Sequence, residues 1–216
     1  LIKSMGWRAT YRVLAVVAAV GFTIAAALVR PAPAMATPVT INLRQLSANP
    51  VFRAMYLAGF LMSVGLFVPF VFLKPYAESQ GVSPAAAATL VSSLGFGSLG
   101  GRLILGTFAG KLGLMRLYQM CFIVLAGSYL IWLLGGASFA MLALFAFVLG
   151  TAYGGYVALS PAAAAELFGV AGLGAVLGAM YTAGGFGGLI GAPLAGWLND
   201  TTEAYTASIV LAMTIS

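Results

Sequence analysis

Apolar residues along this chain fall into runs of about 20 residues, which is the length of helix that crosses a lipid bilayer. Charged residues, prolines and polar clusters separate the runs. The pattern predicts membrane-spanning helices near residues 11–29, 54–73, 85–106, 117–134, 138–159 and 171–196. A further run, residues 205–216, is predicted to be an incomplete seventh span. We therefore expect an all-α integral membrane fold that is truncated at both ends.

Residues 30–53 form the longest connector between these runs. The segment contains four prolines together with Arg30, Arg44 and Arg53. Proline ends or kinks helices, and a cluster of prolines and charges does not favour a membrane span. We predict a linker here, between the helix in residues 1–29 and a helical bundle in residues 54–216.

The basic residues near the ends of the runs indicate the orientation, because cytoplasmic connectors carry an excess of Lys and Arg. If residues 30–53 are cytoplasmic, alternate connectors follow, and Lys111 and Arg116 lie on the same side. Residues 74–84 then lie outside, with Lys74. The basic residues before the first run are the exception, since this orientation places them outside.

The first residues also resemble a secretory signal, because basic residues and an apolar stretch precede the small-residue triplet Ala34, Met35 and Ala36. The apolar stretch is longer than the roughly 7–15 residues of a signal core. Nothing downstream has the character of a secreted protein. A membrane helix is the preferred interpretation, and the signal peptide is the alternative.

Composition excludes an ordinary soluble domain, since 62% of the 216 residues are hydrophobic and 6% are charged. Soluble domains carry roughly 25% charged residues. The formal net charge of +6 comes from basic residues that lie mostly at the ends of apolar runs, so they are interpreted as topology anchors rather than a nucleic-acid surface. We expect a multi-pass protein of the plasma or inner membrane, in contact with lipid and with no nucleic-acid partner.

The sequence contains few residues that could bind a metal or act in catalysis. There is no His, and the single Cys121 lies within an apolar run, which suits a small core residue. Enzymes that act within membranes need a nucleophile with a base, or a metal site. We therefore expect no metal, no cofactor and no enzymatic activity.

Many of the 28 glycines recur four residues apart inside the apolar runs. Small residues one turn apart let helix backbones approach closely. The pairs are Gly97 with Gly101, Gly150 with Gly154, Gly174 with Gly178, Gly184 with Gly188, and Gly187 with Gly191. In the span 171–196 we predict that Gly174, Gly178, Gly184 and Gly188 lie against neighbouring helices.

One stretch, Gly95 to Gly100, matches the dinucleotide-binding pattern G-x-G-x-x-G. That pattern requires a preceding strand and an acidic residue about 20 positions later. No Asp or Glu occurs between Glu78 and Glu166. Helix packing explains these glycines better than nucleotide binding does.

Arg102 is the most informative residue, because a charge at the centre of a membrane helix costs roughly 2.5–3.5 kcal/mol on insertion scales. If its helix continues to Lys111, Arg102 lies roughly 13 Å from the interface, near the midplane. If the helix ends at Gly106, the side chain can reach water. The interpretation as an anion site competes with that of a structural Arg bonded to carbonyl oxygens or to an acid outside this sequence.

Small residues surround Arg102 on its helical face, which favours burial over exposure to lipid. The residues within about 40° of it, at about 100° per residue, are Ala88, Val91, Gly95, Ser98, Gly106 and Ala109. We therefore expect a tight interhelical contact or a polar cavity, with Ser98 one turn away as a hydrogen-bond partner. Tyr153 and Tyr156 are a second candidate wall, although tyrosine hydroxyls also bond neighbouring helices.

Several stretches together resemble the major facilitator superfamily, and within it the monocarboxylate transporter-like branch. GWRATYRVL resembles the start of the sixth helix of that fold, and residues 30–53 resemble its central cytoplasmic loop. VPFVFLKPYAESQGVSPAAAATL resembles the seventh helix, the outer loop and the start of the eighth. ELFG and GAPLAGWLNDTTEAYTAS resemble the connector between the tenth and eleventh helices and the end before the twelfth. The resemblance implies the C-terminal half of that fold, with the N-terminal half as its missing partner.

The run GRLILGTFAGKLGLMR resembles the eighth helix and the superfamily's signature turn. Gly106, Gly110 and Gly113 would permit a close helix reversal, and Lys111 and Arg116 would hold it at the cytoplasmic surface. The superfamily pattern usually has an acid where this chain has Gly110. A plain anchored turn is therefore as good an interpretation as a charged latch.

The resemblance also implies a role for Arg102, because an Arg at the matching position of this branch binds the substrate carboxylate. Animal relatives have an Asp where Ser98 stands, so proton coupling through that Asp is not available here. The oxalate-type exchangers have a Lys near Gly184, which this chain lacks. One Arg without a second cation favours a monoanion.

We therefore expect a secondary transporter, a symporter if a proton is coupled, that moves a small monocarboxylate or a similar organic anion by alternating access. The alternatives are a transporter of a drug or dicarboxylate and a polytopic membrane protein that does not transport.

Overall fold

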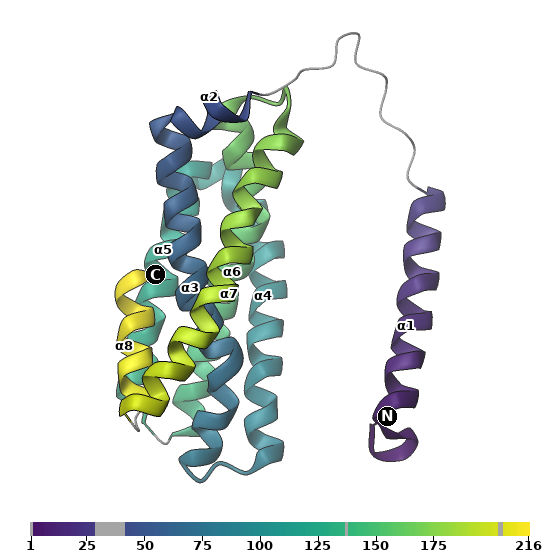
Figure 1. The fold of residues 1–216 in the computed structure, drawn as a ribbon, viewed down its shortest axis with the longest axis vertical. Helices are drawn as coiled ribbons and strands as arrows, with labels where there is room; N and C mark the ends of the chain where they lie inside the picture. Colours follow the sequence, from purple (N-terminus) through teal and green to yellow (C-terminus); the bar gives the residue numbers. More distant parts are fainter. Residues whose placement is uncertain (1, 29–41, 137, 203–204) are drawn as a thin grey trace. The chain divides into compact units, whose positions relative to one another are not determined.

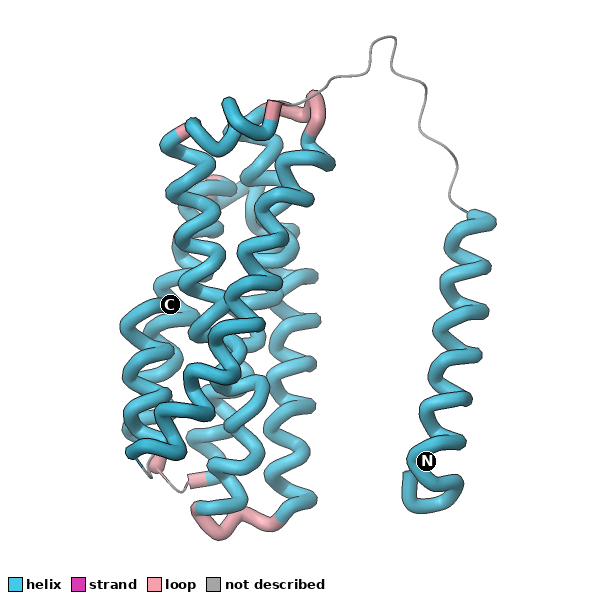
Figure 2. Tube along the Cα trace, viewed as in Figure 1, coloured by secondary structure: helices cyan, strands magenta, loops and turns pink. Residues whose placement is uncertain are grey.

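The computed structural model describes residues 2–28, 42–136, 138–202 and 205–216, and these residues form helices and no strand. Figure 2 shows helix in almost all of them. The chain divides into two compact units, Leu1–Pro38 and Val39–Ser216. The two units are described in turn.

The first unit contains helix α1, Ile2–Leu28. Within it, Gly6–Leu28 is long and apolar enough to cross a membrane. The guanidinium of Arg8 lies 5.0 Å from the ring centroid of Trp7, and the ring of Tyr11 meets Trp7 edge-on. Aromatic and basic side chains at one end of an apolar helix are typical of a membrane interface.

The second unit is a bundle of long helices with two short ones. The elements are α2 (Leu43–Ala48), α3 (Pro50–Ser79), α4 (Pro84–Leu112), α5 (Leu114–Gly135), α6 (Phe139–Phe168), α7 (Leu173–Thr202) and α8 (Tyr205–Ile215). Counting α1, six helices of the described part of the chain can cross a membrane by length and composition. The all-α membrane fold expected from the sequence is therefore confirmed.

The helices extend beyond the apolar windows that predicted them, because caps fix their ends. The side chain of Asn49 accepts a 2.9 Å hydrogen bond from the backbone N–H of Val51, and Pro50 follows it as the first helical residue. Ser83 caps α4 in the same way, at 3.3 Å. Polar N-caps followed by proline start helices independently of hydropathy. The expected linker is also partly helical, since α2 lies within it, whereas residues 29–41 lie outside the described residues.

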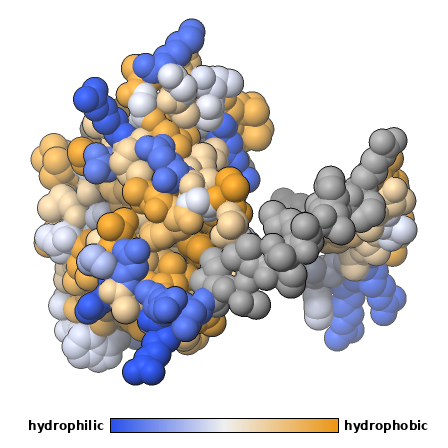
Figure 3. Space-filling model, turned by 90° about the horizontal axis from the view of Figure 1, so that it is seen from above, coloured by the Kyte–Doolittle hydropathy of each residue, from blue (hydrophilic) through white to orange (hydrophobic). Residues whose placement is uncertain are grey.

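Consecutive long helices of the bundle run in opposite directions (Figure 1). Helix α2 and the α6–α7 connector lie at one end, and the α3–α4 connector lies at the other. Seen from the α2 end, hydrophilic residues stand among hydrophobic ones on the surface (Figure 3). The cytoplasmic position of the α2 end stays a prediction from the basic residues.

Glycines bring two pairs of helices into close contact, α4 with α6 and α3 with α7. A Cβ on Gly101 would collide with the backbone of Thr151, and one on Gly154 would collide with the backbone of Ser98. A Cβ on Gly191 would likewise meet the backbone of α3. This is the close approach that small residues allow between membrane helices. The packing predicted from glycine spacing is confirmed at these positions.

Candidate functional site

Arg102 lies within the apolar helix α4, well before its C-terminal end. The helix continues through Gly106 and ends at Leu112, so the first of the two alternatives for Arg102 holds. At about 1.5 Å per residue, its Cα lies about 15 Å along the axis from that end. Snorkelling from the last turn therefore does not explain this arginine.

Of the two settings expected for Arg102, a tight interhelical contact or a polar cavity, this bundle shows no tight contact, because the side chain is exposed. The buried stripe of α4 contains Leu90, Leu94, Gly97 and Gly101 and faces α6. Arg102 lies one residue beyond that stripe, about 100° around the helix. The small residues on its own face, such as Gly95 and Gly106, have no neighbouring atom within 4 Å of a Cβ.

Arg102 instead lines an open pocket of about 320 Å³ formed by three helices. Helix α4 contributes Ser98 and Arg102, α3 contributes Phe70, and α6 contributes Tyr153. The expected grouping of Arg102, Ser98 and Tyr153 is thus present in the geometry. Their role in binding stays a prediction.

No acid of the described residues pairs with Arg102. The one salt bridge in that part of the chain joins Lys74 to Glu78 at 3.3 Å. The same residues offer the guanidinium no hydrogen-bond acceptor within bonding distance. An Arg with five N–H donors and no internal partner can bind an anion at the pocket wall.

Tyr153 links this pocket to a second one of about 280 Å³. The second pocket lies among α3, α6 and α7, and Tyr156 and Tyr181 contribute to its wall. Tyr156 also stacks on Tyr118 of α5 with a centroid distance of 5.6 Å. The two candidate tyrosines therefore face adjacent spaces, and only Tyr153 shares the pocket of Arg102.

Phe70 is a residue of this pocket that the sequence analysis did not identify. Its ring meets the ring of Tyr153 edge-on at a centroid distance of 5.9 Å. It lies in α3 directly after Pro69, in a run rich in aromatic residues. An aromatic residue in such a run is typical of core packing, so spacing alone did not identify it.

The reversal at the predicted signature turn involves fewer glycines than expected. Gly106 and Gly110 are helical residues of α4, and nothing lies within 4 Å of a Cβ built on either. Gly113, with φ of 86°, makes the reversal between α4 and α5. Lys111 lies 6.0 Å from the ring centroid of Phe108, and Arg116 lies in the first turn of α5. The reversal therefore needs only one of the three glycines.

The four glycines predicted to pack in the span 171–196 differ among themselves. Gly188 lies against the ring of Phe67, and Gly184 lies 3.7 Å, measured from a built Cβ, from the hydroxyl of Ser63. A Cβ placed on Gly174 or Gly178 would meet no atom within 4 Å among the described residues, so the expected packing of these two glycines stays a prediction. In this bundle α7 contacts α3 through the stripe that contains Gly187 and Gly191.

Comparisons with known proteins identify the family of this fold. The family model of the Major Facilitator Superfamily matches residues 1–138 and, in a second match, residues 55–215. The chain is 36% identical over 153 residues to Monocarboxylate transporter 12 of Rattus norvegicus, covering 69% of this chain and 32% of that protein. It is 30% identical over 233 aligned positions to Monocarboxylate transporter 11 of Homo sapiens, covering 98% of this chain and 48% of that protein.

A fungal relative extends the comparison. The chain is 31% identical over 167 residues to the MFS transporter asaE of Aspergillus flavus, covering 77% of this chain and 38% of that protein. The chain thus spans about a third to a half of the length of these curated relatives.

Proposed function

This chain belongs to the major facilitator superfamily, and we propose that its protein is a secondary transporter that moves a small monocarboxylate by alternating access. The chain is a multi-pass integral membrane protein. In this proposal residues 54–216 form the C-terminal bundle, residues 1–29 the last helix of an N-terminal half, and residues 30–53 the cytoplasmic loop between them. A second bundle supplies the other wall of the substrate cavity, and no enzymatic step is involved.

The observation that carries the proposal is Arg102, a guanidinium at a pocket wall within a membrane helix, without an acidic partner among the described residues. Ionisable residues at this depth are costly and mark substrate or ion pathways. A carboxylate can accept two parallel N–H bonds from a guanidinium. One such cation suits one carboxylate, and the names of the rat and human relatives point to the same substrate class.

The neighbouring side chains have distinct roles in this proposal. Ser98 adds a hydrogen bond to the bound carboxylate from one turn away on α4, and Tyr153 with Phe70 limits the space for the rest of the substrate. Tyr156 acts from the adjacent pocket. Lys111 and Arg116 anchor the turn at Gly113 on the cytoplasmic side.

The test is uptake by the full-length protein reconstituted in liposomes, with acetate, lactate and pyruvate as probes. Arg102→Ala should abolish uptake per folded molecule, and Arg102→Lys should restore little, because an ammonium does not reproduce the planar pair of donors. Arg44→Ala, which removes an exposed Arg of α2, is the matched control and should transport normally.

A purely structural Arg102 predicts a different result. Both variants would then lose folded protein, and uptake would fall only in proportion to that loss. Wild-type uptake per folded molecule in Arg102→Ala, with stabilisation by the probes retained, would show that the carboxylate is bound elsewhere.

A second candidate substrate is a bulkier organic anion. The pocket of Arg102 and the pocket of Tyr156 share Tyr153, and together they offer more space than acetate or lactate fills. Competition of lactate uptake by aromatic monocarboxylates distinguishes the two candidates. Stronger inhibition by the aromatic acids favours the bulkier substrate, and weaker inhibition favours the small one.

A further inference from the structure

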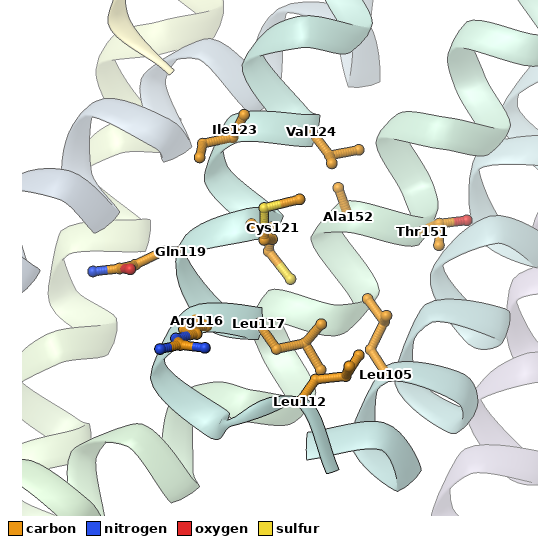
Figure 4. A pocket seen from close by; sticks show the side chains of 11 residues that line it. Leu105, Leu112, Arg116, Leu117, Gln119, Cys121, Ile123, Val124, Thr151 and Ala152 are labelled. Atoms are coloured by element: carbon orange, nitrogen blue, oxygen red, sulfur yellow. The ribbon is translucent and has the colours of Figure 1, made fainter. Parts of the chain in front are cut away.

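A groove of about 580 Å³ lies between α4 and α5, with α6 as its floor (Figure 4). Its walls are almost entirely apolar. The apolar side chains that line it include Leu105, Leu112, Leu117, Met120, Ile123 and Val124. Met120 and Ile123 are 50% and 64% exposed, so the groove opens to the surroundings of the bundle.

This groove shares no lining residue with the pocket of Arg102. On α6 the groove is lined by Thr151 and Ala152, whereas the pocket is lined by Tyr153. On α4 the groove is lined by Leu105 and Leu112, whereas the pocket is lined by Ser98 and Arg102. The groove is therefore distinct from the proposed transport site.

The two polar side chains of α5 in the groove lie near the start of that helix. Arg116 and Gln119 project to one side, away from Leu105 and Leu112 (Figure 4). The Cδ of Arg116 lies 3.9 Å from the position of a Cβ on Gly113, so its stem follows the turn where α5 begins. No acid of the described residues pairs with Arg116.

The apolar part of the groove continues from this charged end along α5. Val124 lies about 12 Å further along the axis than Arg116, at about 1.5 Å per residue. A basic side chain at the end of a membrane helix attracts anionic headgroups. A soluble anion would use Arg116 but would leave the apolar walls uncovered, whereas a neutral lipid would cover the walls but would not use the charge.

We propose that this groove binds an anionic phospholipid, with its phosphate at Arg116 and one acyl chain along Met120, Ile123 and Val124. The phosphate accepts charge-assisted hydrogen bonds from the guanidinium. The acyl chain covers apolar side chains that the bundle leaves exposed. The occupant is thus a lipid of the surrounding leaflet, and the site does not depend on the transported substrate.

Lipid binding to the full-length protein tests this proposal. The purified protein is incubated with phosphatidylglycerol or phosphatidylcholine of identical acyl chains, and retained lipids are counted by native mass spectrometry. The wild type should retain phosphatidylglycerol about fivefold better, as expected for one basic residue near an anionic headgroup. Arg116→Gln should remove that preference, and Met120→Trp, which fills the groove, should lower retention of both lipids.

Two further variants keep the test decisive. Lys111→Gln removes an exposed cation at the same end that does not line the groove, and it should keep the preference. Gln119→Glu places an acid one turn from Arg116 on an exposed position and should remove the preference even if Arg116→Gln folds poorly.

Three results would overturn the assignment. The first is equal retention of both lipids by the wild type, which would indicate binding of acyl chains without a headgroup site. The second is a preference that persists in Gln119→Glu and Arg116→Gln. The third is an equal loss in Lys111→Gln, which would indicate general surface charge.

Discussion

The hydroxyl of Tyr129 on α5 donates a 2.9 Å hydrogen bond to the carbonyl oxygen of Gly65 on α3. Pro69 lies four residues after Gly65 and has no N–H, so the ordinary helical bond to this carbonyl is missing. A carbonyl left unpaired in a membrane protein's interior is costly. Tyr129 therefore satisfies the group that Pro69 leaves free, and it joins two helices in doing so.

The first prediction follows from this bond. Tyr129→Phe should destabilise the protein by about 1 kcal/mol, the usual size of an interhelical hydrogen bond in a membrane. In the background of Pro69→Ala, which restores an N–H to the helix, the same change should cost less. Thermal unfolding in detergent measures both effects. Equal losses of stability in the two backgrounds would show that the contribution of Tyr129 does not depend on Pro69.

The second prediction compares two glycines, Gly154 and Gly178. Each belongs to a pair spaced four residues apart, but the two differ in their contacts. Gly154→Ala should lower thermal stability and folded yield, by about 1–3 kcal/mol, because the new Cβ collides with the backbone of Ser98. Gly178→Ala is the matched control, since its Cβ meets nothing within 4 Å, and it should fold normally. Similar losses in both variants would contradict the packing of α4 on α6.

The third prediction concerns the orientation of the bundle. In a full-length background in which Cys121 and any other cysteine are replaced by Ala, Ser79→Cys should react with a membrane-impermeant maleimide in intact cells. Ser47→Cys should react only after permeabilisation, because α2 and the end of α3 lie at opposite ends of the bundle (Figure 1). Both serines are exposed, so access is limited only by the membrane. Labelling of both from the same side would reject the topology.

Hydropathy predicted the helices but not their ends or their contacts. The apolar window near 54–73 missed the cap at Asn49, which is polar and therefore lies outside any hydropathy signal. Glycine spacing predicted close approach at Gly101 and Gly154 but also at Gly178, where a Cβ would meet nothing within 4 Å among the described residues. Spacing along one helix does not identify the helix opposite, and the face that packs depends on the whole bundle.

The sequence grouped some residues of the candidate site but not others. Ser98 and Arg102 could be grouped because they are one turn apart on α4, and a charge in an apolar run is itself a signal. Phe70 belongs to the same pocket through α3, and no pattern in the sequence relates it to Arg102. The small residues around Arg102 did not distinguish a tight interhelical contact from a polar cavity, because small side chains are compatible with both.

The last prediction tests the pocket through Ser98, which lines it together with Arg102. Ser98→Asp places a carboxylate one turn from the guanidinium, where Asp and Arg four residues apart attract each other. While it is ionised, the new acid should occupy the donors of Arg102 and repel an incoming carboxylate. Apparent affinity for lactate should then fall at least about tenfold, since like charges held close cost several kcal/mol. Protonation of the acid removes the repulsion, so the affinity should recover as the pH falls, which agrees with the Asp that the resemblance implies at this position in animal relatives. Ser98→Asn, which has nearly the same shape without the charge, should keep most of the affinity. Uptake per folded molecule and stabilisation by lactate measure the effect, with folded protein quantified for each variant. If Ser98→Asp takes up lactate as the wild type does at alkaline pH, where the new acid is ionised, the substrate carboxylate does not lie at Arg102, whatever the result for Ser98→Asn.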